Sequence, residues 1–140
     1  MKVGSILMPM SIGELLDKIT ILEIKSERIA DDDKRRNVET ELHGLIAIWD
    51  GLRGRYPGVE ELKQGLKAAN EAMWDVQDGL REREAAKNFD DEFIRLACAV
   101  GRENAVRVGI KNDINRLVGS SFIDEKEYQA DAGRPQGKDS

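Results

Sequence analysis

The polar side chains best placed to do chemistry lie in two stretches in the second half of the chain. In the first stretch acidic residues recur at helical spacing, and in the second, charged and amide side chains interrupt an apolar helical pattern. If the two stretches form an antiparallel helical hairpin that turns near Phe89, their polar residues face each other. The resulting polar row consists of Glu71, Trp74, Asp75, Asp78, Glu103, Asn104, Arg107 and Lys111.

This polar row has a structural and a functional interpretation. Buried charges are costly unless they are paired, so a row whose members pair with one another would fix the register of two helices. A row of unpaired, convergent groups would instead line a pocket between helices, where helical bundles commonly bind ligands. In both cases we expect the polar residues of the second stretch to reach the acidic residues of the first, with Arg107 near Glu71.

Paired carboxylates suggest a metal-dependent alternative. Asp75 and Asp78 are one helical turn apart, as are Glu14 and Asp17, and carboxylates at this spacing can hold Mg²⁺. An all-α nucleotide pyrophosphatase uses acidic helices of this kind, although this chain lacks the full acidic pattern of that group. The single histidine, His43, stands at no recognisable metal-ligand spacing. We therefore predict that His43 is a surface or capping residue, and we predict no metal site and no cofactor.

Basic side chains suggest a second enzyme class. A chorismate-mutase-like bundle needs convergent Arg or Lys side chains, for which Arg28, Arg107 and Lys111 are the candidates, without a motif to support them. Neither pattern assigns a catalytic residue. The leading hypothesis is therefore a non-enzymatic interaction or scaffold module, and the alternative is a small-molecule or metal-dependent enzyme that uses the polar row.

Four amphipathic patterns supply the helices that would position these residues. Apolar residues at helical spacing predict helices over residues 11–30, 34–52, 59–80 and 91–118. Ser11 and Glu14 have the spacing of a capping box at the start of the first helix, and Gly119 suits the end of the last. N-cap candidates for the second and fourth helices are Asp31, Asp32 or Asp33, and Asn88 or Asp90. The sequence therefore predicts an all-α domain of four main helices, arranged as two antiparallel helical hairpins with bundle or coiled-coil-like packing.

The first predicted helix is apolar on more than one face. Its main stripe consists of Ile12, Leu15, Leu16, Ile19 and Leu22. Ile21 and Ile24 fall outside this stripe, as expected for a helix that is central in a bundle or shared with a second subunit. Trp74 likewise lies away from the apolar seam of its helix. We therefore predict a homodimer with either Ile21 and Ile24 or Trp74 at its interface, and we allow for a further protein partner.

Composition narrows the class of protein. The chain has 140 residues, of which 35% are charged and 5% aromatic, a balance typical of helical proteins. The formal net charge of −5 argues against nucleic acid or an anionic membrane as the main partner. We predict one helical domain over residues 1–128, followed by a disordered polar tail over residues 129–140.

The cellular location of the protein can be predicted from the lack of membrane-spanning and signal segments. No tract approaches the roughly 20 apolar residues of a membrane-spanning helix, and the N-terminus has no long apolar region of the kind found in signal peptides. The single cysteine, Cys98, stands in an apolar run and is expected to be a small buried residue. We therefore predict a cytoplasmic protein.

Four motifs suggest a family. They are SIGELLDKITILEIKSERI from Ser11, WDVQDGLR from Trp74, RENAVRVGIKNDIN from Arg102 and IDEKEY from Ile123. Across residues 9–128 the chain resembles a small, uncharacterised bacterial all-helical domain family. The resemblance implies a domain that works as a unit, sometimes near sugar-transfer or repeat proteins, and it carries over no reaction and no catalytic residue. That family usually has an acidic residue where this chain has Gln77, which weakens a metal hypothesis for that helix.

Overall fold

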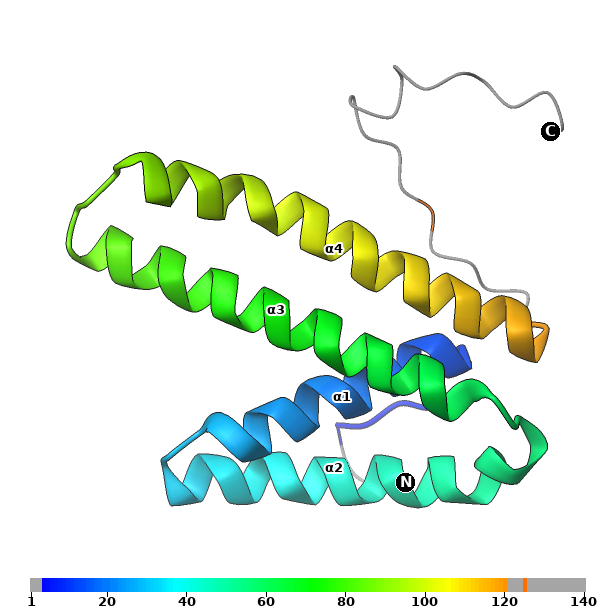
Figure 1. Cartoon of the computed structure of the whole chain (residues 1–140). Coiled ribbons are helices and arrows are strands. Elements are labelled where there is room, and N and C mark those ends of the chain that lie inside the picture. Colours follow the sequence, from blue (N-terminus) through cyan, green and yellow to red (C-terminus); the bar gives the residue numbers. More distant parts are fainter. Residues whose placement is uncertain (1–3, 121–124, 126–140) are drawn as a thin grey trace, which may run out of the picture.

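The computed structural model describes residues 4–120 and residue 125 (Figure 1). Within these residues it contains four α-helices, one short 3-10 helix and no strand. The elements are α1 (Ile12–Arg28), α2 (Asp32–Leu52), η1 (Arg53–Arg55), α3 (Val59–Ala85) and α4 (Asp91–Val118). The predicted all-α fold is therefore confirmed, and the helices match their predicted positions except that α3 continues past residue 80.

Two helical hairpins build the fold. α1 packs against α2, α3 packs along α4, and α1 also contacts both α3 and α4. Figure 1 shows α3 and α4 running side by side, with their connecting turn extending beyond α1 and α2. α1 is therefore the element that joins the two hairpins, which explains why it is apolar on more than one face.

The core forms where α1 meets the other three helices. Its buried side chains are Leu15, Leu16, Ile19, Leu22, Leu42, Trp49, Val59, Leu66 and Ile114. Ile24 is only 1% exposed, so its side chain is covered within one chain and is not available to a second subunit. Ile21 and Trp74 are half-buried. The dimer itself stays a prediction, but Ile24 is wrong as an interface residue because intramolecular packing already buries it.

Three of the helices have an N-cap hydrogen bond at their first turn. In α1, α2 and α4 the side chain of the N-cap residue accepts a hydrogen bond from the backbone N–H three residues later, at 2.9–3.1 Å. These N-cap residues are Ser11, Asp31 and Asp90. Gly119 ends α4 with a φ of 74°, a left-handed conformation that favours glycine. All four residues are among the helix-end residues that the sequence predicts. They could be predicted because a cap depends only on residues that are close in the chain.

Cys98 corrects one sequence prediction, because it is exposed rather than buried. The inward face of α4 at this point is set by Leu96 and Ala99, which are both buried. Residues in a helix are about 100° apart, so Cys98 lies on the side opposite to Leu96. His43 is exposed, as predicted. The predicted domain limit at residue 128 and the predicted tail at 129–140 lie outside the described residues.

A helix that spans a membrane must be both long and apolar. No helix in the described part of the chain is long and apolar enough to cross a membrane. The cytoplasmic location stays a prediction.

Candidate functional site

The register of the α3/α4 hairpin decides which polar residues meet. A Cβ atom built on Gly79 would lie 2.9 Å from Leu96 Cδ1, and one built on Gly65 would lie 3.8 Å from Ile110 Cδ1. Both pairs are equidistant from a point just before residue 88, rather than from Phe89. Each residue of α4 therefore faces α3 almost one helical turn closer to the start of α3 than predicted.

The end of α3 explains this difference. α3 continues to Ala85, and Lys87 then adopts a left-handed φ of 53°. The N–H of Asn88 donates to the carbonyl of Arg83 at 2.8 Å, which is the hydrogen bond of a helix-ending Schellman turn. The chain therefore reverses earlier than a turn centred on Phe89 would allow.

Two basic residues of the polar row turn toward α1 instead of α3. Arg107 Nη1 donates to Asp17 Oδ2 at 3.1 Å. Lys111 Nζ donates to Glu14 Oε1 at 2.8 Å and lies 3.9 Å from Asp17 Oδ2. Asp17 is only 6% exposed and Lys111 is also buried. The basic half of the row therefore joins α4 to α1, and the prediction that it reaches the acidic residues of α3 is wrong for Arg107 and Lys111.

Asp17 is the centre of this network. Its second oxygen, Oδ1, accepts a hydrogen bond from Asn70 Nδ2 of α3 at 3.0 Å. The same amide nitrogen lies 3.0 Å from Thr20 Oγ1, whose hydroxyl donates to the carbonyl of Asp17 at 2.9 Å. One buried carboxylate thus binds groups from α3 and α4, which offsets the cost of removing its charge from water.

A close backbone contact holds α1 against α4 beside the network. The backbone N–H of Gly13 donates to Asn115 Oδ1 at 2.8 Å. A Cβ on Gly13 would lie 2.7 Å from both Asn115 Oδ1 and the carbonyl oxygen of Lys111, closer than real side chains approach. Glycine at this position is therefore what allows α1 and α4 to come near enough for Glu14 to reach Lys111.

The acidic half of the polar row lies elsewhere. Asp75 forms an ion pair with Arg28 at 2.6 Å, and Asp78 with Arg81 at 2.5 Å. The hydrogen bond to Asp75 raises the pKa of Arg28 above its ordinary value. The guanidinium of Arg28 also lies 5.8 Å from the centre of the Trp74 ring, a cation–π contact.

The remaining row residues have no common centre. Glu71 is half-buried on α3, and Glu103 and Asn104 are half-buried on α4. Arg28 stands about 16 Å along the α1 axis from Asp17, at 1.5 Å per residue, so it does not converge with Arg107 as a chorismate-mutase-like site requires. In the described part of the chain, no three His, Cys, Asp or Glu side chains are grouped so that they could hold a metal ion.

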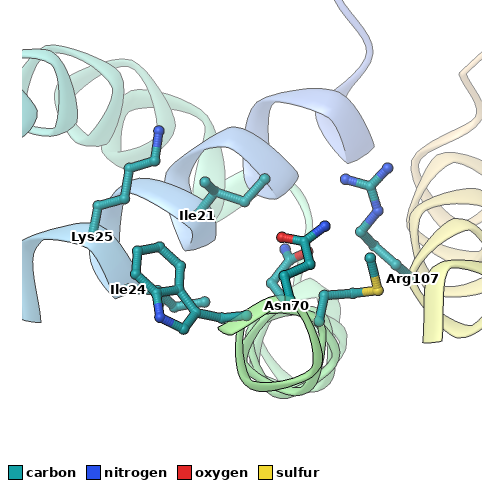
Figure 2. Close-up of a pocket in the computed structure, with 8 residues that line it drawn as sticks. Ile21, Ile24, Lys25, Asn70 and Arg107 are labelled. Atoms are coloured by element: carbon teal, nitrogen blue, oxygen red, sulfur yellow. The ribbon is translucent and has the colours of Figure 1, made fainter. Parts of the chain in front are cut away.

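A cavity of about 270 Å³ opens beside the network, between α1, α3 and α4. It is lined by Ile21, Ile24, Lys25, Asn70, Met73, Trp74, Gln77 and Arg107. Figure 2 shows Ile21, Ile24 and Lys25 on α1, with Asn70 between Ile21 and Arg107. Of the polar row, only Trp74 and Arg107 line this cavity.

Sequence reasoning missed most of the network. The sequence suggests a capping role for Glu14 and a metal pair of Glu14 with Asp17, and it gives no role to Thr20, Asn70 or Asn115. A signal for them exists, because Gly13, Asp17 and Thr20 are small or polar at intervals of four and three residues within an apolar helix. Such a stripe marks the face on which a second helix approaches closely.

These observations define the chain as a small all-α domain whose two hairpins are joined by a buried ionic network. The chain belongs to a family described as a family of unknown function (DUF6165), whose model matches residues 6–138. The expectation of an uncharacterised domain family is thereby confirmed. Comparison with curated proteins and with solved structures found no match.

Proposed function

We propose that this chain is a non-enzymatic interaction module that pairs with a second copy of itself. The observation that carries the proposal is an apolar groove of about 430 Å³ between the segment before α1 and the faces of α1 and α2. The groove is lined by Ile6, Leu7, Met8, Met10, Ser11, Ile12, Leu15, Leu45, Ile48 and Leu52. Leu7 is 91% exposed and Ile48 is 55% exposed, and large contiguous apolar surface of this kind is typical of interaction sites.

The shape of this surface favours a second copy as the occupant. The segment over residues 6–10 presents projecting apolar side chains, and the hollow lies between this segment and the faces of α1 and α2. Gly44 and Gly51 flank Ile48 on α2, and a Cβ on either glycine would meet no atom within 4 Å. Another helix can therefore approach α2 closely. A two-fold axis would bring the ridge of each copy to the hollow of the other, as a self-complementary dimer requires.

Charge points to the same occupant. The chain carries a formal net charge of −5, so two copies repel each other across most faces. Residues 6–10 contain no charged side chain, and residues 44–51 contain only Asp50, which pairs with Arg53 at 3.1 Å. Two copies that meet on this surface therefore bring few like charges together.

The internal pairing of the polar row supports a module rather than an enzyme. Both oxygens of Asp17 already accept hydrogen bonds, and Lys111 is bound to Glu14. A catalytic acid, base or metal ligand needs free capacity at the reacting atom. In this network the charged groups are used to hold α1, α3 and α4 together.

Matched charge substitutions test the proposal. Ile48→Glu places a carboxylate in the groove, whereas Ile94→Glu places one on α4 at a position that is 56% exposed. We expect Ile48→Glu to sediment as a monomer, because the buried charge is unpaired at the interface, and Ile94→Glu to sediment like the wild type. Leu7→Glu should behave like Ile48→Glu. Sedimentation velocity in which both α2 and α4 variants match the wild type would refute the groove as the interface.

A further inference from the structure

The cavity between α1, α3 and α4 has a chemical character that the proposed dimer does not use. Its lining includes the basic residues Lys25 and Arg107 and no acidic residue, although the chain as a whole is acidic. Four of its other lining residues are apolar or aromatic, including Trp74 and Ile21. A cavity lined by both basic and apolar side chains suits a small organic anion.

Arg107 supplies the anion-binding group. One end of its guanidinium, Nη1, is bound to Asp17. Its Nε is shielded from solvent and has no hydrogen-bond partner among the described residues, and no partner of its Nη2 is found there either. The Nε–Nη2 edge is the side of an arginine that binds a carboxylate through two parallel hydrogen bonds. A carboxylate that binds there has to turn the guanidinium until this edge faces the cavity, and it would then provide the acceptor that the buried Nε lacks.

The residues around Arg107 indicate what the rest of the ligand should look like. Asn70 lies between Ile21 and Arg107 in Figure 2, so its amide borders the place where the carboxylate would sit. Trp74, Met73 and the two isoleucines would cover an apolar or aromatic body. Lys25 also lines the cavity and has no ion pair among the described residues, and Figure 2 shows its side chain projecting from α1 with the amine pointing away from Asn70 and Arg107. It adds positive charge to the lining of the cavity.

We propose that this cavity binds a small carboxylate with a compact apolar or aromatic body, with Arg107 as the carboxylate-binding residue. The volume of about 270 Å³ lies near the lower end of small-molecule sites, so the body is about the size of one aromatic ring. The proposal is independent of the dimer, because the cavity and the apolar groove share no lining residue.

The two tryptophans of the chain provide an internal control for the test. Trp74 lines the cavity, whereas Trp49 is buried in the core on α2. Benzoate is the probe, with benzyl alcohol as the uncharged analogue and inorganic phosphate as an anion without an apolar body. In a ¹H–¹⁵N titration of the full chain, we expect benzoate to shift the indole signal of Trp74 saturably and to leave that of Trp49 in place. The two other compounds should bind at least about tenfold more weakly, since each lacks one half of the recognition.

Variants separate the role of Arg107 from its structural contact. Arg107→Lys keeps a positive charge for Asp17 but removes the Nε–Nη2 edge, and we expect it to weaken benzoate binding about tenfold. Arg102→Lys, at an exposed position on the same helix, should bind benzoate like the wild type. Ile21→Phe, which fills the cavity without changing its charge, should also abolish binding and decides the matter if Arg107→Lys fails to fold. The proposal is overturned if benzoate leaves the Trp74 signal unmoved, if phosphate or benzyl alcohol binds equally well, or if the cavity variants bind like the wild type.

Discussion

Asp17→Asn tests the claim that one buried carboxylate joins the two hairpins. Asparagine has nearly the same shape, so the change removes the negative charge and one acceptor without creating a cavity. Arg107 then loses a charge-assisted hydrogen bond at 3.1 Å, or Asn70 loses its bond at 3.0 Å. Losing one bond to a charged group costs about 1.5–3 kcal/mol, and breaking a buried pair costs about 3–5 kcal/mol. Because Arg107 keeps part of its surface exposed, we expect a loss of about 2–4 kcal/mol.

Asp75→Asn is the matched control for this substitution. Asp75 also pairs with an arginine of another helix, at 2.6 Å, but its side chain is 67% exposed. Exposed ion pairs contribute about 0–1 kcal/mol, so we expect this variant to lose less than about 1 kcal/mol. Urea unfolding of both variants at one protein concentration measures the two losses, with an unchanged m-value as the condition for comparison. The reasoning is refuted if Asp17→Asn unfolds within about 0.5 kcal/mol of the wild type, or if Asp75→Asn is the more damaging change.

Two further substitutions test how the helices approach and begin. Gly13→Ala should destabilise the chain by about 1–3 kcal/mol in chemical denaturation, because the added Cβ would lie 2.7 Å from two oxygen atoms of α4. Gly101→Ala is the control, because its Cβ would meet no atom within 4 Å, and it should be neutral or stabilising. Equal losses of stability in the two variants would contradict the close approach of α1 and α4. The hydrogen bond from the N–H of Phe93, assisted by Arg83, lowers the pKa of Asp90, so the stabilisation from its charge is present above the ordinary aspartate pKa and is lost as pH falls through the lower folded pKa. Asp90→Asn keeps an N-cap acceptor but does not titrate, so its stability deficit at neutral pH should close over that acidic range; a deficit that stays constant with pH would contradict the role of the charge.

The helices of this fold could be predicted because their signals are local. Ser11, Asp31 and Asp90 cap the helices that their positions suggested, and Gly119 ends the last one. The phase of a long helix is harder to predict, and Cys98 shows why. An apolar run tells which residues can be buried, but α3 and α4 extend beyond α1 and α2, so part of that run has no neighbour to cover it.

The polar row could be recognised from the sequence, but its partners could not. The sequence predicts that Arg107 and Lys111 face α3, because helices that follow each other in the chain usually pack as a hairpin. Their partners lie on α1, some 90 residues or more away in the chain, and they meet only because Gly13 lets α1 approach α4. That approach depends on how two hairpins cross, which no local pattern determines. The clearest indication of the crossing in the sequence is that α1 is apolar on more than one face. The central position of α1 between the two hairpins explains this pattern.

The molar mass of the wild-type chain in solution tests the proposed function most directly. One chain has a mass of 15.7 kDa. Multi-angle light scattering over a range of micromolar concentrations should give twice that mass at the upper end, falling toward the mass of one chain on dilution. A mass of 15.7 kDa at every concentration would contradict the pairing of two copies through the apolar groove.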